Sequence, residues 1–171
     1  MGSAQTYGYF IAFTAALGGL LFGYEIGIIN SVLEMDAFSL FFGMHEMTPA
    51  GAFEKTAEST FRKSSIVTAF VFGCIPGALI ITFFGDWLGR KRAIMTGTFM
   101  FTAGGLIQAL VPASSSVTGR LTTIVAGRFL GGCGIGMLSG SVPLYIAEIA
   151  PNEQRGRLTS VQQLMITIGI A

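Results

Sequence analysis

The chain has 171 residues, of which 51% are hydrophobic and only 11% are charged, and its net charge is +1. A soluble domain carries roughly 25% charged residues, so this composition excludes an ordinary soluble protein and is typical of a membrane protein. No basic stripe is interleaved with aromatic residues, which excludes a nucleic-acid partner. Cys74 and Cys133 lie in apolar runs and His45 lies in a polar loop, so we expect no metal site, no cofactor and no disulfide.

Apolar stretches long enough to cross a bilayer recur along the chain. Crossing about 30 Å of hydrocarbon takes roughly 20 residues in a helix. Four stretches meet this requirement, and a fifth apolar run begins at residue 158 and continues to residue 171. We therefore expect an incomplete fifth span and a chain that is part of a longer protein. The predicted spans are residues 9–32, 65–84, 93–111, 121–146 and 158–171.

The connectors between these stretches predict the orientation. The long connector 33–63 mixes acidic and basic residues, whereas the short connector 85–92 contains Arg90, Lys91 and Arg92 in succession. Basic residues concentrated in short loops mark the cytoplasmic side. We therefore expect the connector 85–92 to face the cytoplasm.

Two predicted spans carry ladders of small residues. In membranes such ladders allow helix backbones to approach closely, and ordinary bundle packing explains most of them. The ladders are Gly19, Gly23 and Gly27 in the first span, and Gly132, Gly136 and Gly140, with Gly127 and Gly131, in the fourth.

Two charged residues lie inside predicted spans, where charges are costly and usually functional. At about 1.5 Å per residue, Glu25 lies roughly 24 Å from the start of the first span and Arg128 roughly 10 Å from the start of the fourth. Because neighbouring spans run in opposite directions along the chain, the two depths are similar. One interpretation is a static ion pair; the other is a carboxyl group that gains and loses a proton as the arginine releases and engages it.

Polar residues near the remaining spans allow two interpretations each. Asp86, Gly89 and the following cations form a tight turn that could contact lipid phosphates or acidic neighbours. Glu148 and Arg155 beside the end of the fourth span could form ion pairs or a solvated loop. In the fifth run, the amides of Gln162 and Gln163 need partners, which either a neighbouring helix or a hydroxyl-rich substrate would supply.

Five motifs in order resemble the sugar porters of the major facilitator superfamily, especially fungal-type hexose transporters. The resemblance extends from about residue 17 to residue 171. The motifs are GGLLFGYEIGIIN at 18–30, GDWLGRKR at 85–92, GRFLGGCGIGM at 127–137, PLYIAEIAPNEQRGRL at 143–158 and QQLMITIGI at 162–170.

This resemblance implies an all-α membrane protein with the major facilitator fold. Such proteins have twelve spans in two six-helix halves, with one sugar bound near the midplane between the halves. The chain would supply most of the N-terminal half, with four complete transmembrane helices and the start of the fifth. The implied activity is transport of a monosaccharide such as a hexose by alternating access, not enzymatic catalysis, in a multi-pass protein of the plasma membrane.

The resemblance also implies roles for individual residues. Glu25 matches the proton-carrying position, which is Asp in proton-coupled relatives, and Arg128 matches its partner. The implied sugar contacts are Gln163, Ile166, Ile170 and Phe22, with Gln162 beside them; the implied cytoplasmic gate residues are Asp86, Gly89, Arg90, Arg92, Glu148 and Arg155.

The implied partners are a sugar, a proton, the bilayer and the C-terminal half of the same protein. Here Trp87 stands where the signature motif commonly has Arg, and Glu25 has a longer side chain than the usual Asp. Three alternatives share these motifs: a facilitator without proton coupling, a sugar sensor that does not transport, and a carrier of quinate, a polyol or a disaccharide.

Overall fold

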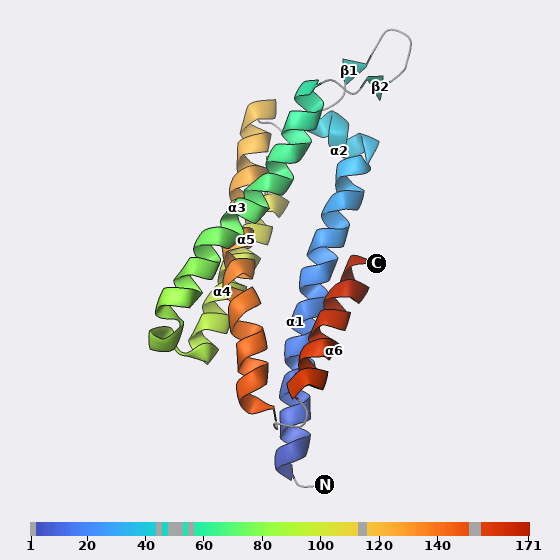
Figure 1. Cartoon of the computed structure of the whole chain (residues 1–171). Coiled ribbons are helices and arrows are strands. Elements are labelled where there is room, and N and C mark those ends of the chain that lie inside the picture. The colour runs from blue at the N-terminus through green and yellow to red at the C-terminus, as the bar shows by residue number, and fades with distance from the viewer. Residues whose placement is uncertain (1–2, 44–45, 48–52, 55–56, 113–115, 151–154) are drawn as a thin grey trace. The chain divides into compact units, whose positions relative to one another are not determined.

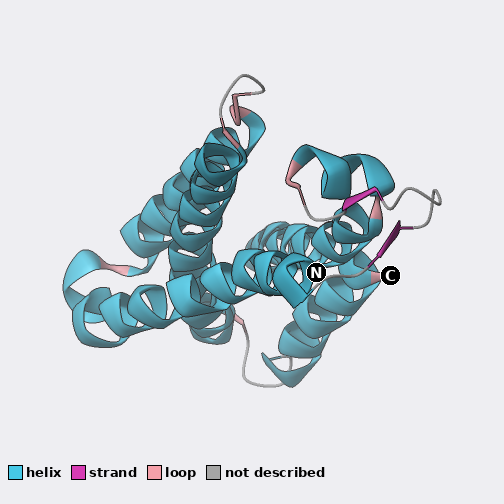
Figure 2. Ribbon diagram, turned by 90° about the horizontal axis from the view of Figure 1, so that it is seen from above, coloured by secondary structure: helices cyan, strands magenta, loops and turns pink. Residues whose placement is uncertain are grey.

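The protein is helical almost throughout the part that its computed structural model describes, which is residues 3–43, 46–47, 53–54, 57–112, 116–150 and 155–171 (Figures 1 and 2). The all-α fold class is therefore confirmed, with one short antiparallel strand pair in addition. The helices are α1 (Ser3–Glu34), α2 (Asp36–Phe41), α3 (Ala57–Leu88), α4 (Arg90–Ala109), α5 (Val117–Ile149) and α6 (Arg155–Ile170), and the strands are β1 (Glu46–Met47) and β2 (Phe53–Glu54).

The helices corresponding to the predicted spans mostly extend beyond the apolar residues. There are two exceptions at the C-terminal ends: α4 ends at Ala109, two residues before the end of the stretch 93–111, and α6 ends at Ile170, one residue before the end of the stretch 158–171. The connector 85–92 is helical except at Gly89, whose φ of 76° and ψ of 147° separate α3 from α4. Among the described residues, two helical segments, Ser59–Leu88 and Val117–Ile149, are long and apolar enough to cross a membrane.

The chain forms two compact units, one from Met1–Ser31 with Ser139–Ala171 and the other from Val32–Leu138. The first unit contains most of α1, the end of α5 and all of α6. The second contains the end of α1, the helices α2 to α4 and most of α5.

Within the unit 32–138, glycines allow α5 to pack directly against the backbones of two helices. A Cβ atom at Gly77 of α3 would lie 2.1 Å from the carbonyl oxygen of Cys133, and one at Gly136 would lie 2.2 Å from that of Cys74. On another face of α5, a Cβ at Gly104 of α4 would lie 2.7 Å from the carbonyl oxygen of Gly127. Of the predicted ladder, Gly127 and Gly136 therefore take part in close backbone packing in this unit, whereas Gly140 lies in the other unit.

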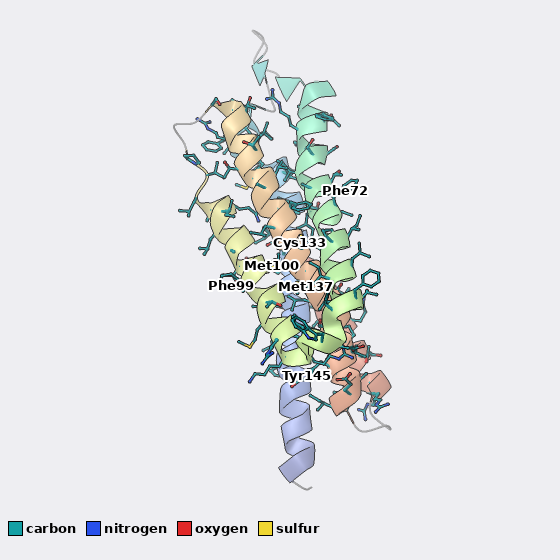
Figure 3. All side chains as sticks on the ribbon, turned by 90° about the vertical axis from the view of Figure 1, so that its left-hand side faces the viewer. Phe72, Phe99, Met100, Cys133, Met137 and Tyr145 are labelled. Carbon is teal, nitrogen blue, oxygen red and sulfur yellow. The ribbon has the colours of Figure 1, made fainter. Side chains whose placement is uncertain are left out.

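The side chains of this unit separate into buried and exposed groups (Figure 3). Cys133 and Met137 of α5 are buried, and both described cysteines are free. Phe72 of α3 and Phe99 of α4 are 60% and 74% exposed. Such exposure of large apolar side chains is expected of helices that face lipid or another part of a membrane protein.

In the unit formed by residues 1–31 and 139–171, α6 lies beside α1 (Figure 1). A Cβ at Gly23 would lie 2.0 Å from the carbonyl oxygen of Ile166, and a Cβ at Gly169 would lie 2.3 Å from that of Leu20. Only glycine permits backbones this close, so the first predicted ladder is the surface on which α1 and α6 meet.

Candidate functional site

Arg128 is the most deeply buried charge that the structure describes, with 4% of its surface exposed. It lies in α5, and its guanidinium carbon is 5.6 Å from the centroid of the Phe70 ring on α3. A cation over an aromatic face is attracted by the ring quadrupole, and this attraction is strongest away from water. The neighbouring helix therefore contributes a favourable surface for a charge that the apolar surroundings would otherwise disfavour.

Glu25, the predicted partner of Arg128, is half-buried in α1. It belongs to the unit containing residues 1–31, whereas Arg128 belongs to the unit 32–138. Each charge thus has a defined place within its own unit, and the pairing of the two remains a prediction.

The two adjacent glutamines of α6 have different environments. Gln162 is 8% exposed and packs against α1, where a Cβ at Gly19 would lie 3.3 Å from the Cγ atom of Gln162. Its Oε1 atom is buried without a hydrogen-bond partner among the described residues. Gln163, on the next position of the helix, is exposed. The structure therefore separates one amide that is packed between helices from one that is accessible.

The other predicted sugar contacts lie in the same unit as Gln163. Ile166 and Ile170 follow it by three and seven positions in α6, which places them toward the same side of the helix. Ile166 is half-buried against α1, Ile170 is 45% exposed, and Phe22 of α1 is half-buried.

The signature connector forms a compact turn between α3 and α4. The Nη2 atom of Arg90 lies 3.1 Å from the Oδ1 atom of Asp86, one helical turn earlier. Gly89 has a positive φ of 76°, which a residue with a side chain adopts only with strain. Arg92 and Trp87 are exposed, and Trp87 is 83% exposed. The motif thus contains an internal ion pair that its sequence did not predict.

Glu148 and Arg155 lie on either side of the junction between α5 and α6. Glu148 is exposed near the end of α5, and Arg155 is the first residue of α6. The Nε atom of Arg155 donates a hydrogen bond to the carbonyl oxygen of Ala150, at 3.3 Å. Pro151 follows directly in the sequence and is a residue type that limits a helix, but it lies outside the described residues.

Sequence reasoning missed two arginines that bind backbone carbonyls, Arg62 of α3 and Arg120 of α5. Each lies near the N-terminal end of its own helix, where the helix dipole disfavours a cation. That unfavourable position was the available signal that the side chains act on another element. Among the described residues, no group of three His, Cys, Asp or Glu side chains could hold a metal ion.

Comparison with known proteins places these features in a family. Residues 11–171 match the family described as "Sugar (and other) transporter". The chain is 35% identical over 162 residues to the galactose-proton symporter of Escherichia coli K12, covering 95% of this chain and 30% of that protein. It is also 35% identical over 161 residues to the mouse facilitated glucose transporter member 4, covering 92% of this chain and 31% of that protein.

A solved structure shows the same fold. The inward-open xylose transporter XylE from E. coli superposes with a TM-score of 0.76 at 27% identity, covering 96% of this chain and 38% of that one. The chain thus spans about a third of the length of the relatives that it matches. The family match over nearly all of the chain and the shared fold agree with the five motifs. The chain belongs to the sugar transporter family of the major facilitator superfamily, whose members are membrane proteins.

Proposed function

We propose that this chain is the N-terminal part of a transporter that carries a monosaccharide, such as a hexose, across the plasma membrane together with a proton. The transporter alternates between conformations open to either side of the bilayer, and it makes and breaks no covalent bond. The two relatives described above support sugar as the substrate class, since one is a galactose-proton symporter and the other a facilitated glucose transporter. The C-terminal half of the protein would complete the sugar site.

The observation that carries the proton-coupled form of the proposal is the burial of Arg128 in a helix apolar enough to cross a membrane. An intramembrane guanidinium favours the ionised form of a nearby carboxyl group, whereas apolar surroundings favour the protonated form. Glu25, half-buried in α1, is the carboxyl group on which these opposing effects would act. Arg128 would therefore control the proton affinity of Glu25 as it approaches and withdraws.

Gln163 is the proposed principal sugar contact in this half. Its exposed amide offers both donors and an acceptor, which match the hydroxyl groups of a sugar. Ile166, Ile170 and Phe22 would form the apolar part of the contact, and the amide oxygen of Gln162 would add an acceptor. Asp86, Gly89, Arg90, Arg92, Glu148 and Arg155 would form the cytoplasmic gate.

Three alternative functions use the same half of the fold. A facilitator would carry sugar without a proton and would keep Glu25 in a structural role; the mouse relative is named as a facilitated glucose transporter. A sugar sensor would bind the substrate without moving it. A carrier of quinate, a polyol or a disaccharide would differ chiefly in the other half, which contributes part of the specificity.

The test uses the complete protein reconstituted in vesicles, with sugar uptake and external pH recorded together. A symporter alkalinises the external medium as the sugar enters, and Glu25→Gln abolishes this alkalinisation and the pH dependence of uptake. The matched control is Glu34→Gln, because Glu34 lies in the same helix but its side chain is 72% exposed and pairs with Lys63 at 3.6 Å.

The possible outcomes separate the alternatives. Uptake without alkalinisation, together with unchanged pH dependence in Glu25→Gln, would contradict proton coupling and favour the facilitator. Sugar binding without uptake would indicate the sensor. Competition of unlabelled monosaccharides, polyols and disaccharides against labelled glucose uptake would identify the substrate class.

A further inference from the structure

The short helix α2 is held by side chains from two helices distant in sequence. Arg62 of α3 donates hydrogen bonds from Nη1 to the carbonyl oxygen of Phe42, at 3.3 Å, and to that of Gly43. Arg120 of α5 donates from Nη1 to the carbonyl oxygen of Phe41, at 2.9 Å, and its guanidinium carbon lies 4.3 Å from the centroid of the Phe41 ring. All these residues belong to the unit 32–138.

These contacts add to the hydrogen bonding at the C-terminal end of α2. The last carbonyl groups of a helix have no partner within it. Two earlier carbonyls accept backbone bonds, Phe38 from the N–H of Phe42 and Leu40 from the N–H of Gly43, both at 3.1 Å. The next three carbonyls are those that the two arginines bind. Positive charge at this end also matches the dipole of α2.

The helix depends on this support because it has only six residues. Isolated helices of fewer than about 12 residues are marginal in water, so tertiary contacts must maintain α2. Phe42, directly after α2, is 3% exposed, and its ring lies 4.5 Å from that of the half-buried Phe38, so apolar burial also contributes at this end of α2. Apolar burial has no preferred direction, whereas the arginine hydrogen bonds fix the end of α2 in one place.

The position of α2 also fixes the end of α1. A single residue, Met35, lies between Glu34 at the end of α1 and Asp36 at the start of α2, and its φ of −70° and ψ of 129° are extended. Gly43, with a φ of 62°, lies just beyond the other end of α2. The helix α2 is therefore a short segment between two non-helical joints, and its helical form depends on the arginine contacts.

We propose that Arg62 and Arg120 form a clamp that docks α2, and with it the end of α1, onto α3 and α5, and that opening of this clamp is a conformational step of the protein. The clamp opens when the guanidinium groups leave the three carbonyls; α2 then leaves its place between Met35 and Gly43, and its backbone hydrogen bonds loosen. The α3, α4 and α5 packing does not change in this step, because it rests on separate glycine contacts.

The test is hydrogen–deuterium exchange of the complete protein in detergent or nanodiscs, read by mass spectrometry. The double variant Arg62→Gln/Arg120→Gln is expected to exchange the amides of residues 36–43 at least tenfold faster, while peptides from 66–84 and 124–137 change less than twofold. Unchanged exchange in residues 36–43, or an equal increase in all three regions, would overturn the clamp.

Two further variants test the clamp without removing its positive charge: one keeps both arginines, and the other replaces them with lysines. In Gly43→Ala, a Cβ would lie 2.9 Å from the Nη1 atom of Arg62 at a strained positive φ, so faster exchange of residues 36–43 is expected. In Arg62→Lys/Arg120→Lys the charges remain but the planar donors and the stacking on Phe41 are lost, so exchange should be intermediate. Wild-type exchange in both variants would contradict the geometry described.

The matched control is Lys63→Gln, which removes a neighbouring cation that pairs with Glu34 and binds none of the three carbonyls. Its α2 exchange is expected within twofold of wild type, and a tenfold increase would refute a role specific to the arginines. A further readout, which rests on the proposed function, is transport: Gly43→Ala should change the maximal sugar uptake rate at least threefold while the sugar Kd stays within twofold. Hydrogen–deuterium exchange does not depend on transport, so the clamp and the proposed transport function can be contradicted independently of each other.

Discussion

Gly104 and Gly105 are neighbours on α4 that meet different surroundings. A Cβ atom at Gly104 would lie 2.6 Å from the backbone nitrogen of Gly131 and 2.7 Å from the carbonyl oxygen of Gly127, both on α5. A Cβ at Gly105 would have no atom of another element within 4 Å. Replacing each glycine by alanine adds the same methyl group to the same helix, so the pair isolates the effect of close backbone packing.

The expected difference follows from the distances. The atoms that Gly104→Ala would meet belong to the backbone, so α4 and α5 must separate. A gap of about 0.5–1 Å forfeits a quarter to a half of the dispersion energy of each contact along the crossing. Overpacking of this kind costs about 1–3 kcal/mol. Alanine gains up to about 1 kcal/mol of helix propensity over glycine, but this gain is common to both variants and cancels in the comparison.

The assay is thermal unfolding of the complete protein in detergent. One kcal/mol shifts the midpoint by about 2–4 °C in a folding unit of 150–250 residues, so Gly104→Ala should unfold several degrees below Gly105→Ala. Gly105→Ala should unfold at or slightly above the wild-type temperature. Equal midpoints for the two variants would refute the inferred backbone contact between α4 and α5.

Two other predictions concern the turn and the sugar contacts. Gly89→Ala should lower the unfolding temperature because alanine at a φ of 76° costs about 1–3 kcal/mol. Gly85→Ala should not, because its Cβ would meet only side chains at van der Waals distance, Arg90 at 3.5 Å and Ile81 at 3.8 Å. Equal midpoints for the two variants would contradict the strain at Gly89. Gln163→Ala should raise the sugar Kd roughly 3- to 10-fold, as expected for a lost hydrogen bond of about 1 kcal/mol. Gln162→Ala should raise the sugar Kd less, because the amide of Gln162 is buried against α1. Titration calorimetry measures both Kd values, and a larger effect of Gln162→Ala would exclude Gln163 as the principal contact.

Hydropathy predicted the positions of the long helices because it detects the apolar part of each helix. It did not predict their ends, since polar residues at the ends of α3 and α5 continue the backbone hydrogen bonding beyond the apolar part. For the same reason the connector 85–92 was expected to be a loop, although only Gly89 leaves the helical conformation. The helix α2 is apolar at four of its six residues, but this run is too short for a membrane span, so hydropathy did not predict it.

The candidate site was predictable where a residue type is unusual for its surroundings. Arg128 stands out because a charge interrupts an apolar helix, and its burial confirms that it does not face water. Arg62 and Arg120 give a weaker signal, because a cation near the N-terminal end of a helix opposes the helix dipole but can still interact with solvent. Only the folded chain brings them to carbonyl groups that lie 19 to 79 residues away in sequence.

The glycines of α5 and its buried arginine belong to one packing arrangement. In lipid no hydrophobic force drives helices together, so close backbone contact must supply much of the attraction. A Cβ at Gly132 would lie 2.2 Å from the carbonyl oxygen of Phe70, so glycine at this position allows α3 to approach α5 at Phe70. The Phe70 ring then lies within reach of the guanidinium of Arg128, one turn earlier on α5. The small residue creates the contact, and the contact provides the aromatic surface that offsets part of the cost of burying the charge.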